Sequence, residues 1–256
     1  RVVDRRVLHL INSWLGCPVE DTDKRGRKTR STANRDMGKG IPQGSPISPL
    51  LSNLYMRRFI LGWQRWHASR QLGAKIVNYA DDLVILCKPG KAEQALLAMR
   101  TLMGRLKLSV NEEKTRTCNA AREHFDFLGY TFGVYYSKRT GGAYYGLRPS
   151  KRSVRKLVEK LRDLTDPRLV WLDATTAVTA INRTLRGWAN YFSLGTVSDS
   201  YRAVDAYTTS RLRRWLLKKH KSSRNGMHAY SSEQLLETLG LERLSGRRSN
   251  LPWAMV

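Results

Sequence analysis

The length, composition and charge of the chain exclude several classes of protein. It has 256 residues, enough for one large domain or two modest ones, and its 41% apolar content argues against an intrinsically disordered chain. There are 46 Lys and Arg residues against 21 Asp and Glu, a net charge of +25. A chain this basic needs a polyanionic partner, and nucleic acid is the usual one. A merely soluble basic protein or a binder of anionic lipid is less favoured, because the charge recurs throughout and no amphipathic anchor stands out.

The cysteines and apolar stretches argue against further classes. Cys17, Cys87 and Cys118 are odd in number and far apart, so neither a disulfide framework nor a zinc site is expected. No apolar stretch is long enough to span a membrane and no signal peptide is evident. We therefore expect a protein that is not secreted and is cytoplasmic in a bacterium or organellar. The sequence begins with Arg1 inside a helical pattern, which indicates a fragment.

The first half of the chain is predicted to alternate helices with short strands. Residues 18–40 are polar and charged, as in a loop or an exposed hairpin, and a turn follows at 41–44. Two apolar runs within 75–87 flank Asp81-Asp82 and predict two buried strands joined at an acidic turn. The helices predicted from apolar spacing and from a Ser48-Pro49 start signal cover residues 3–15, 48–70 and 91–106.

The second half is predicted to begin with β structure and to continue as basic helices. A β region opens at Phe125 and contains a Gly141-Gly142 turn, and the composition changes near Pro149. The predicted helices that follow cover residues 150–164, 174–192, 199–220 and 231–239. The fold class is therefore α+β, with a boundary near residue 148. The expected divisions are an α+β domain 1–148, a helical domain 149–225 and a polar tail 226–256.

The acidic turn carries the strongest chemical signal. Crowded carboxylates repel one another and raise each other's pKa unless a divalent cation relieves the repulsion, and hard oxygen ligands suit Mg²⁺. A pair of such ions about 3.5–4 Å apart can stabilise the attacking and leaving oxygens of a phosphoryl transfer. The alternative is a solvated turn, since Asp is a common turn residue. Apolar strands on both sides of Asp81 and Asp82 favour the metal site.

The residues around this turn carry a family resemblance. The tetrad Tyr79-Ala80-Asp81-Asp82 resembles the YxDD box of reverse transcriptases. Upstream, GIPQGSPISPLLSNLY at residues 40–55 resembles the PQG-x-x-SP block, which lines the site for primer–template and incoming nucleotide. The resemblance assigns substrate binding to Tyr79, Ala80, Pro42, Gln43 and Gly44. Gly44 permits close backbone approach to a ligand, and Gln43 offers an amide for hydrogen bonding. An ordinary turn before a capped helix is the alternative.

Two further blocks follow in the family's order. LSVNEEKT at residues 108–115 resembles the stretch after the catalytic hairpin, and its Lys114 is thereby placed near the incoming triphosphate. An ammonium there can offset the charge of the pyrophosphate leaving group. A surface lysine is the alternative. Phe127-Leu128-Gly129-Tyr130 resembles the FLG block called the primer grip, with Phe127, Leu128 and Gly129 as its site residues. A core β-strand is its alternative, and both interpretations can hold together.

RGWANYF at residues 186–192 resembles the signature of domain X, the maturase thumb. Helical spacing predicts Trp188, Tyr191 and Phe192 as core residues. RNA binding is expected on the basic faces of the neighbouring helices instead, where few acids neutralise the charge. A solvated face is the alternative. The residues predicted to contact RNA are Lys151, Arg152, Arg155, Lys156, Arg211, Arg214 and Lys218.

Together these blocks resemble a group II intron reverse transcriptase/maturase. The resemblance implies a partial palm followed by a helical thumb. It also implies RNA-directed DNA polymerase activity with splicing assistance, and two Mg²⁺ ions held by Asp81 and Asp82. The implied partners are an intron RNA template, a DNA primer and deoxynucleoside triphosphates, with no membrane and with a homodimer left open. The catalytic residues implied are Asp81, Asp82 and Lys114.

The chain departs from the family at its start. The family's other catalytic aspartate and its fingers are missing, and by resemblance they lie upstream of Arg1, so this polypeptide is not expected to polymerise alone. No nuclease arrangement of Cys or His residues is found. Two alternatives stay open: a splicing maturase that binds RNA without polymerising, and a reverse transcriptase recruited elsewhere, such as to a defence system. The residues that precede Arg1 would discriminate between the polymerase and the binding module.

Overall fold

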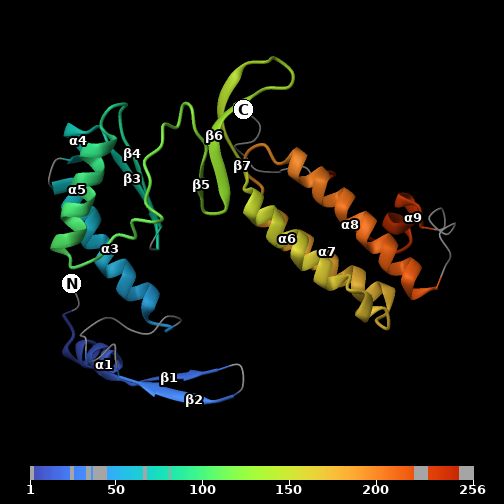
Figure 1. Cartoon of the computed structure of the whole chain (residues 1–256), viewed down its shortest axis with the longest axis horizontal. Coiled ribbons are helices and arrows are strands. Elements are labelled where there is room, and N and C mark those ends of the chain that lie inside the picture. Colours follow the sequence, from blue (N-terminus) through green and yellow to red (C-terminus); the bar gives the residue numbers. More distant parts are fainter. Residues whose placement is uncertain are drawn as a thin grey trace. The chain divides into compact units, whose positions relative to one another are not determined.

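A computed structural model describes residues 3–23, 26–32, 36, 45–65, 68–80, 82–221 and 230–247. Helices and small antiparallel sheets make up these residues, so the fold is α+β, as the sequence predicted (Figure 1). The chain divides into two compact units, Arg1–Thr117 and Cys118–Val256. Each unit has its own hydrophobic core.

The first unit begins with a capped helix and an exposed hairpin. Helix α1 spans Arg5–Gly16, and Asp4 is its N-cap: the Asp4 carboxylate accepts a hydrogen bond from the Arg6 amide at 2.7 Å. Strands β1 (Val19–Thr22) and β2 (Lys28–Ser31) pair antiparallel and are almost entirely exposed. Of the two forms expected for residues 18–40, a loop or an exposed hairpin, the structure shows the exposed hairpin over residues 19–31.

The core of the first unit is formed by helices packed against a second hairpin. The elements are α3 (Ser48–Arg65), the short α4 (Ala68–Gln71), β3 (Lys75–Tyr79), β4 (Asp82–Leu86) and α5 (Ala92–Arg105). Phe59 and Trp63 of α3 meet Met99 and Leu102 of α5, and the hairpin covers them. The helix predicted over 48–70 is confirmed over Ser48–Arg65, and residues 68–70 lie in α4. The helix predicted over 91–106 is confirmed, and it lies behind the hairpin.

The β3–β4 hairpin has one buried face and one open face. Ile76, Leu83 and Ile85 pack on the core of the unit, whereas Val77 and Leu86 are each 47% exposed. Successive side chains of a strand point to opposite faces of the sheet. A two-stranded sheet that packs on a single layer of helices can therefore bury only one of its two faces. The prediction of two strands is confirmed. The prediction that both strands are buried is confirmed for one face of the hairpin and is wrong for the other.

The second unit opens with a three-stranded antiparallel sheet of order β5-β6-β7. Its strands are β5 (Phe125–Phe127), β6 (Tyr130–Tyr136) and β7 (Ala143–Pro149). The β6–β7 turn contains Gly141 at φ +68°, a conformation that favours glycine. The glycine turn predicted inside this β region is confirmed.

In the described part of the second unit, three long helices and two shorter ones follow the sheet. They are α6 (Lys151–Leu164), α7 (Ala174–Tyr191), α8 (Ser198–Lys219) and α9 (Ser232–Glu237), with the short 3₁₀ helix η1 (Pro167–Leu169) after α6. The three long helices lie side by side (Figure 1) and share a core that includes Leu161, Ile181, Leu185, Leu212 and Leu216. Within the described residues, no helix is both long and apolar enough to cross a membrane.

The sheet and the helices of the second unit are bonded directly to each other. The amide of Ser150 donates to the carbonyl of Gly129 at 2.8 Å, and the amide of Thr196 donates to the carbonyl of Leu147 at 3.0 Å. The compositional change near residue 148 therefore falls inside the second compact unit, which begins at Cys118. Composition changes at 148 because strands give way to basic helices.

Candidate functional site

Asp82, the second residue of the acidic pair, begins strand β4 of the β3–β4 hairpin. Strand β3 ends at Tyr79 and β4 begins at Asp82, and these two residues face each other in the register. Asp82 and Tyr79 are both exposed. Among the described residues, nothing forms an ion pair or hydrogen bond with the Asp82 carboxylate. Asp81 lies outside the described residues, as do the predicted substrate-binding residues Pro42, Gln43 and Gly44.

The exposed Asp82 carboxylate is a suitable ligand for a hard cation. Mg²⁺ takes oxygen ligands, keeps few from the protein and shares its shell with substrate phosphates. In the part of the chain that the structure describes, no three His, Cys, Asp or Glu side chains gather into a metal site. The donor chemistry of the exposed Asp82 carboxylate fits a cation that takes few of its oxygens from the protein.

Lys114 lies in a turn that is closed by Asn111. The Asn111 side-chain oxygen accepts from the Lys114 amide at 3.2 Å. Its carbonyl accepts from the Thr115 amide at 3.0 Å and from the Thr115 hydroxyl at 2.8 Å. Asn commonly stabilises turns through its own side chain. The asparagine and threonine of the NEEKT motif therefore shape the backbone, and the Lys114 side chain is left exposed.

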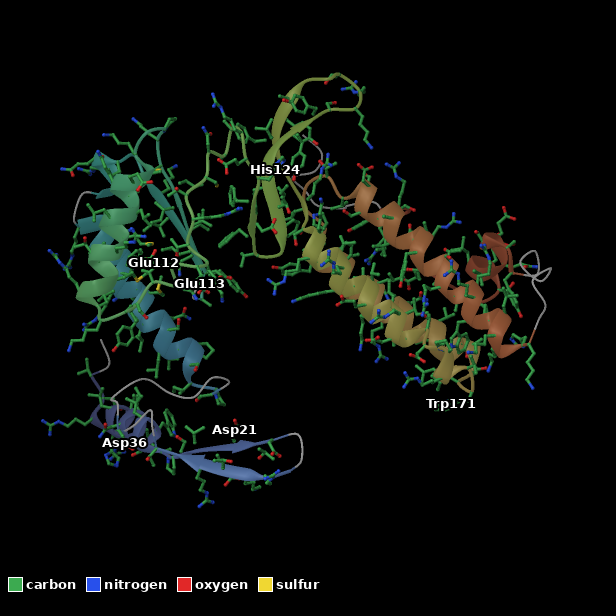
Figure 2. The ribbon with its side chains drawn as sticks, viewed as in Figure 1. Asp21, Asp36, Glu112, Glu113, His124 and Trp171 are labelled. Carbon is green, nitrogen blue, oxygen red and sulfur yellow. The ribbon has the colours of Figure 1, made fainter. Side chains whose placement is uncertain are left out.

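This turn is fixed to helix α5 by a paired arginine and glutamate. Arg100 donates to both carboxylate oxygens of Glu112, at 2.6 and 3.1 Å (Figure 2 labels Glu112). The two parallel bonds have the fork geometry that makes arginine–carboxylate pairs directional. The hydrogen bond to Glu112 raises the pKa of the Arg100 guanidinium. Lys114 is thus carried on a loop tied to the helix that supports the β3–β4 hairpin.

The FLG block forms a tight turn at one end of the second unit's sheet. Phe127 pairs with Tyr130 in the register, so Leu128 and Gly129 are the two residues between the strands. Both have positive φ, +49° and +78°. Positive φ at both central residues is the pattern of a type I′ hairpin turn. Glycine adopts this conformation readily, whereas Leu128 needs contacts from outside the turn to hold it there.

Those contacts come from helices α6 and α7. The Gly129 carbonyl accepts from the Ser150 amide at 2.8 Å and from the Ser153 hydroxyl at 2.9 Å. The Leu128 carbonyl accepts from the Tyr191 hydroxyl at 3.0 Å. Both carbonyls of the turn are therefore bonded to residues more than twenty positions away in sequence. The turn is held by the helices that follow it.

Tyr130 makes the reciprocal connection from the sheet to α7. Its hydroxyl donates to the Tyr191 carbonyl at 2.6 Å and accepts from the Leu194 amide at 3.4 Å. Its ring lies 5.0 Å from that of Phe192 and 6.1 Å from that of Tyr191. Burial raises the pKa of Tyr130, so the hydroxyl stays protonated and able to donate at neutral pH. We call the contacts of Tyr130 and Tyr191 across this junction the tyrosine clamp.

The RGWANYF segment is only partly core. Phe192 is buried, and Trp188 is partly buried against the Phe192 ring at 4.8 Å and the Tyr201 ring at 5.9 Å. Tyr191, in contrast, is 55% exposed. The prediction that Tyr191 is a core residue is therefore wrong. Its helical position faces the FLG turn, and its hydroxyl bonds the turn while one side of its ring remains in solvent.

The basic face of α6 is exposed as predicted. Leu157 and Leu161 point into the core, and the opposite side of the helix presents cationic side chains. Within the described part of the chain, no ion pair or side-chain hydrogen bond neutralises them. These residues are Lys151, Arg152, Arg155 and Lys156. They remain candidates for contact with phosphates.

On α8 the predicted RNA-binding residues divide into two groups. Arg214 and Lys218 are exposed. Arg211 instead closes the C-terminal end of α6, donating to the Arg162 carbonyl at 3.2 Å and to the Thr165 carbonyl at 3.1 Å. The last carbonyls of a helix have no partner inside it, and a basic side chain can satisfy them. The structure therefore gives Arg211 a role in stability, one that its neighbours in sequence do not reveal.

Comparison with known protein families identifies two regions of the chain. Residues 2–132, slightly more than half of the chain, match the model of the reverse transcriptase (RNA-dependent DNA polymerase) family. Residues 154–231 match the group II intron maturase-specific domain. The chain belongs to the group II intron reverse transcriptase and maturase family. The FLG turn lies in the first match and RGWANYF in the second, so the tyrosine clamp joins the two matched regions.

A relative in Escherichia coli strain K12, Protein YkfC, is 31% identical in the aligned part. The alignment covers 38% of this chain and 33% of that protein, so the chain spans about a third of the relative's length. Membership of the family identifies the chain as part of a nucleotidyltransferase lineage that binds RNA templates and uses divalent metal ions. The tyrosine clamp could not be predicted from the sequence, because no local pattern shows that two motifs some sixty residues apart are in contact.

Proposed function

We propose that the whole protein is an RNA-directed DNA polymerase of a group II intron, and that it also binds its intron RNA and assists splicing. The observation that carries the proposal is the exposed Asp82 carboxylate at the start of β4, next in sequence to Asp81 and backed by a packed helical layer. A rigid hairpin can present carboxylates at a fixed place on the surface. The matched family supplies the chemistry that such carboxylates serve.

Each motif residue then has a chemical task. Asp81 and Asp82 would hold two Mg²⁺ ions, which when bound supply charge stabilisation at the attacking and leaving oxygens of phosphoryl transfer. The Lys114 ammonium, on its turn tied to α5, offsets negative charge on the pyrophosphate leaving group. Gln43 and Gly44 contribute an amide and close backbone approach on the nucleotide side.

The two units correspond in this proposal to a partial palm and to a thumb that carries the primer grip. The FLG turn presents Phe127, Leu128 and Gly129 to the primer, and the tyrosine clamp fixes that turn to the helices. The exposed cations of α6, with Arg214 and Lys218 of α8, contact phosphates of the RNA. Deoxynucleoside triphosphates and a DNA primer are the remaining partners.

The test of polymerase activity is the Asp81→Asn variant of the full-length protein. We expect it to abolish primer extension and to leave RNA binding intact, because it removes a metal ligand without changing the size of the side chain. Asp21→Asn, a matched change on the exposed strand β1, should extend primers as the wild type does. Retained extension by Asp81→Asn would contradict the assignment. A wild-type protein that binds intron RNA but never extends a primer would instead be a maturase alone.

RNA binding by α6 has its own test. Replacing Lys151, Arg152, Arg155 and Lys156 with Gln should make the dependence of log affinity on log salt shallower, by about 0.7–0.9 for each phosphate that the variant no longer neutralises. The fold should survive, since changes of surface charge usually cost within about 0.5 kcal/mol each. The measurement is a salt titration of binding to labelled intron RNA. An unchanged slope would place the RNA elsewhere.

A further inference from the structure

A polar pocket of about 320 Å³ lies in the second unit, between one side of α8 and the segment that follows α9. Arg202 and Arg213 reach it from α8, and Arg243 reaches it from the later segment. Hydroxyls of Thr209 and Ser210 also line it. Three guanidinium groups brought together from separate parts of the chain are a strong local concentration of positive charge. The motifs of the family include none of these residues.

The pocket belongs to a different side of α8 from the cations predicted for RNA binding. Its α8 residues recur at spacings of three and four, from Arg202 through Asp205 and Thr209 to Arg213, and so form one stripe. Arg214 and Lys218 form a second stripe, and the buried residues of α8 lie between the two. The pocket is therefore an additional surface of the helix.

The walls of the pocket are fixed by hydrogen bonds. Arg213 donates to the Tyr230 carbonyl at 2.8 Å and to the Ser232 hydroxyl at 3.3 Å. The Asp205 carboxylate accepts from the amides of Leu244 and Ser245, at 2.8 and 2.9 Å. The Arg213 bonds attach the start of α9 to α8, and the Asp205 bonds attach the segment after α9 to α8, without any ligand. The pocket is thus preformed, which lowers the entropic cost of binding.

A buried asparagine on α7 holds the same segment from the other side. Asn182 donates to the Gly240 carbonyl at 2.7 Å and accepts from the Glu242 amide at 3.0 Å. Leu241 and Leu244 lie in the hydrophobic core of the unit. Arg243, between these two buried leucines, is therefore presented outward from an anchored backbone.

The charge balance of the lining favours an anion. Among the described residues, Asp205 is the acid in the lining, and both its oxygens already accept backbone amides. Arg202 shares the Asp199 carboxylate with Lys138, at 2.5 and 2.9 Å, so it is incompletely neutralised. Arg243 has no ion pair or hydrogen bond to any described residue. The pocket therefore retains uncompensated guanidinium charge with hydroxyl donors beside it.

We propose that this pocket binds a backbone phosphodiester of the bound RNA, with Arg243 as its principal contact. Guanidinium groups and hydroxyls match the several oxygens of a phosphate. The pocket, of about 320 Å³ and open to solvent, leaves room for a phosphate group of a longer strand. The site rests on the proposed RNA binding and adds to it a contact independent of α6.

Arg243→Gln tests the site, because Arg243 is exposed and its replacement leaves the fixed walls in place. In the full-length protein we expect affinity for labelled intron RNA to fall about tenfold at low salt, the size of effect expected when a hydrogen bond to a charged group is removed. The salt slope should become shallower by about 0.7–0.9. Arg243→Lys should keep most of the slope. Arg183→Gln, a matched exposed arginine on α7 outside the pocket, should keep both affinity and slope.

Each other outcome overturns the proposal in a recognisable way. Unchanged affinity and slope in Arg243→Gln, with a reduced slope in the α6 variant, would confine RNA to α6. Unchanged binding in both variants would refute the proposed RNA contacts altogether. The remaining alternative is a site for free inorganic phosphate, which a different measurement would reveal. Inorganic phosphate at fixed ionic strength would raise the melting temperature of the wild type but not of Arg243→Gln, and RNA binding would stay the same.

Discussion

The two hairpins that carry family motifs are supported in opposite ways. The β3–β4 hairpin packs one face on α3 and α5, and its other face and its tip are open. The β5–β6 turn has both of its carbonyls bonded to α6 and α7, and a buried tyrosine behind it. The β3–β4 hairpin presents residues to solvent, whereas the β5–β6 turn is held in place by hydrogen bonds to the helices that follow it.

The difference matches the chemistry proposed for each hairpin. Carboxylates that hold metal ions shared with a substrate must be accessible, so the tip around Asp82 cannot be covered by its own chain. A turn that grips a primer must hold its backbone at a fixed position and needs support from behind. Because this hairpin is left uncovered, the apolar side chains of Val77 and Leu86 on its open face remain partly exposed to solvent.

The largest expected effect is that of Trp188→Ala. This change removes the ring between Phe192 and Tyr201 and should destabilise the second unit by about 3 kcal/mol, the lower end for an aromatic truncation because the ring is partly exposed. Hydrogen exchange resolved by peptide should show reduced protection in α6–α8 and unchanged protection in α3 and α5. Full protection of α7 in the variant would mean that this ring is not part of the core. Val77→Ser, on the open face of β3, is the control and should change little.

Gly129→Ala is expected to have the next largest effect. At φ +78° an alanine costs about 1–2 kcal/mol, and its Cβ would also lie 3.0 Å from the Ser153 hydroxyl and 3.1 Å from the Phe192 ring. Gly141→Ala has a similar backbone cost at φ +68° but meets no atom within 4 Å. Urea unfolding of the two variants should therefore show the larger destabilisation for Gly129→Ala. Equal destabilisation would show that the turn is not pressed against the helices.

Tyr191→Phe tests the tyrosine clamp with a smaller expected effect. Removing the hydroxyl deletes one hydrogen bond, to the Leu128 carbonyl, and should cost about 0.5–1.5 kcal/mol in unfolding free energy. NMR should show chemical-shift changes concentrated in the FLG turn. Tyr136→Phe, at a tyrosine that is 69% exposed, is the matched control and should be neutral. If the two variants behave alike, the hydroxyl of Tyr191 does not hold the turn.

The smallest expected effect concerns Asp199, where β6–β7 meets α8. Hydrogen bonds from Lys138 and then Arg202 lower the pKa of this carboxyl. A lowered folded pKa means stability that is present above the pKa of the unfolded chain and is lost as pH falls through the folded value. An NMR titration of the carboxyl carbon should give a midpoint below that of an unperturbed aspartate. Lys138→Gln should raise that midpoint, and an unchanged midpoint would show that the pair does not persist in solution.

Much of the local structure could be predicted because it depends on short-range patterns. The Asp4 cap, the strands on either side of Asp81-Asp82 and the helix behind them follow from side-chain periodicity and capping chemistry. The sequence motifs indicated the family, and the family matches over residues 2–132 and 154–231 confirmed it. The roles assigned to Lys114 and to the basic residues of α6 stay predictions, because they depend on ligands that bind from outside.

By itself the sequence determined the order of helices and strands, the acidic turn between apolar strands and the excess of positive charge. The tertiary structure alone decided that Tyr191 bonds Leu128, that Arg211 closes α6 and that Arg243 joins Arg202 and Arg213 around one pocket. The physical reason is the range of the interactions. Periodicity and capping act within a few residues, whereas a side-chain hydrogen bond forms between any groups that folding brings within about 3 Å, however far apart they lie in the chain.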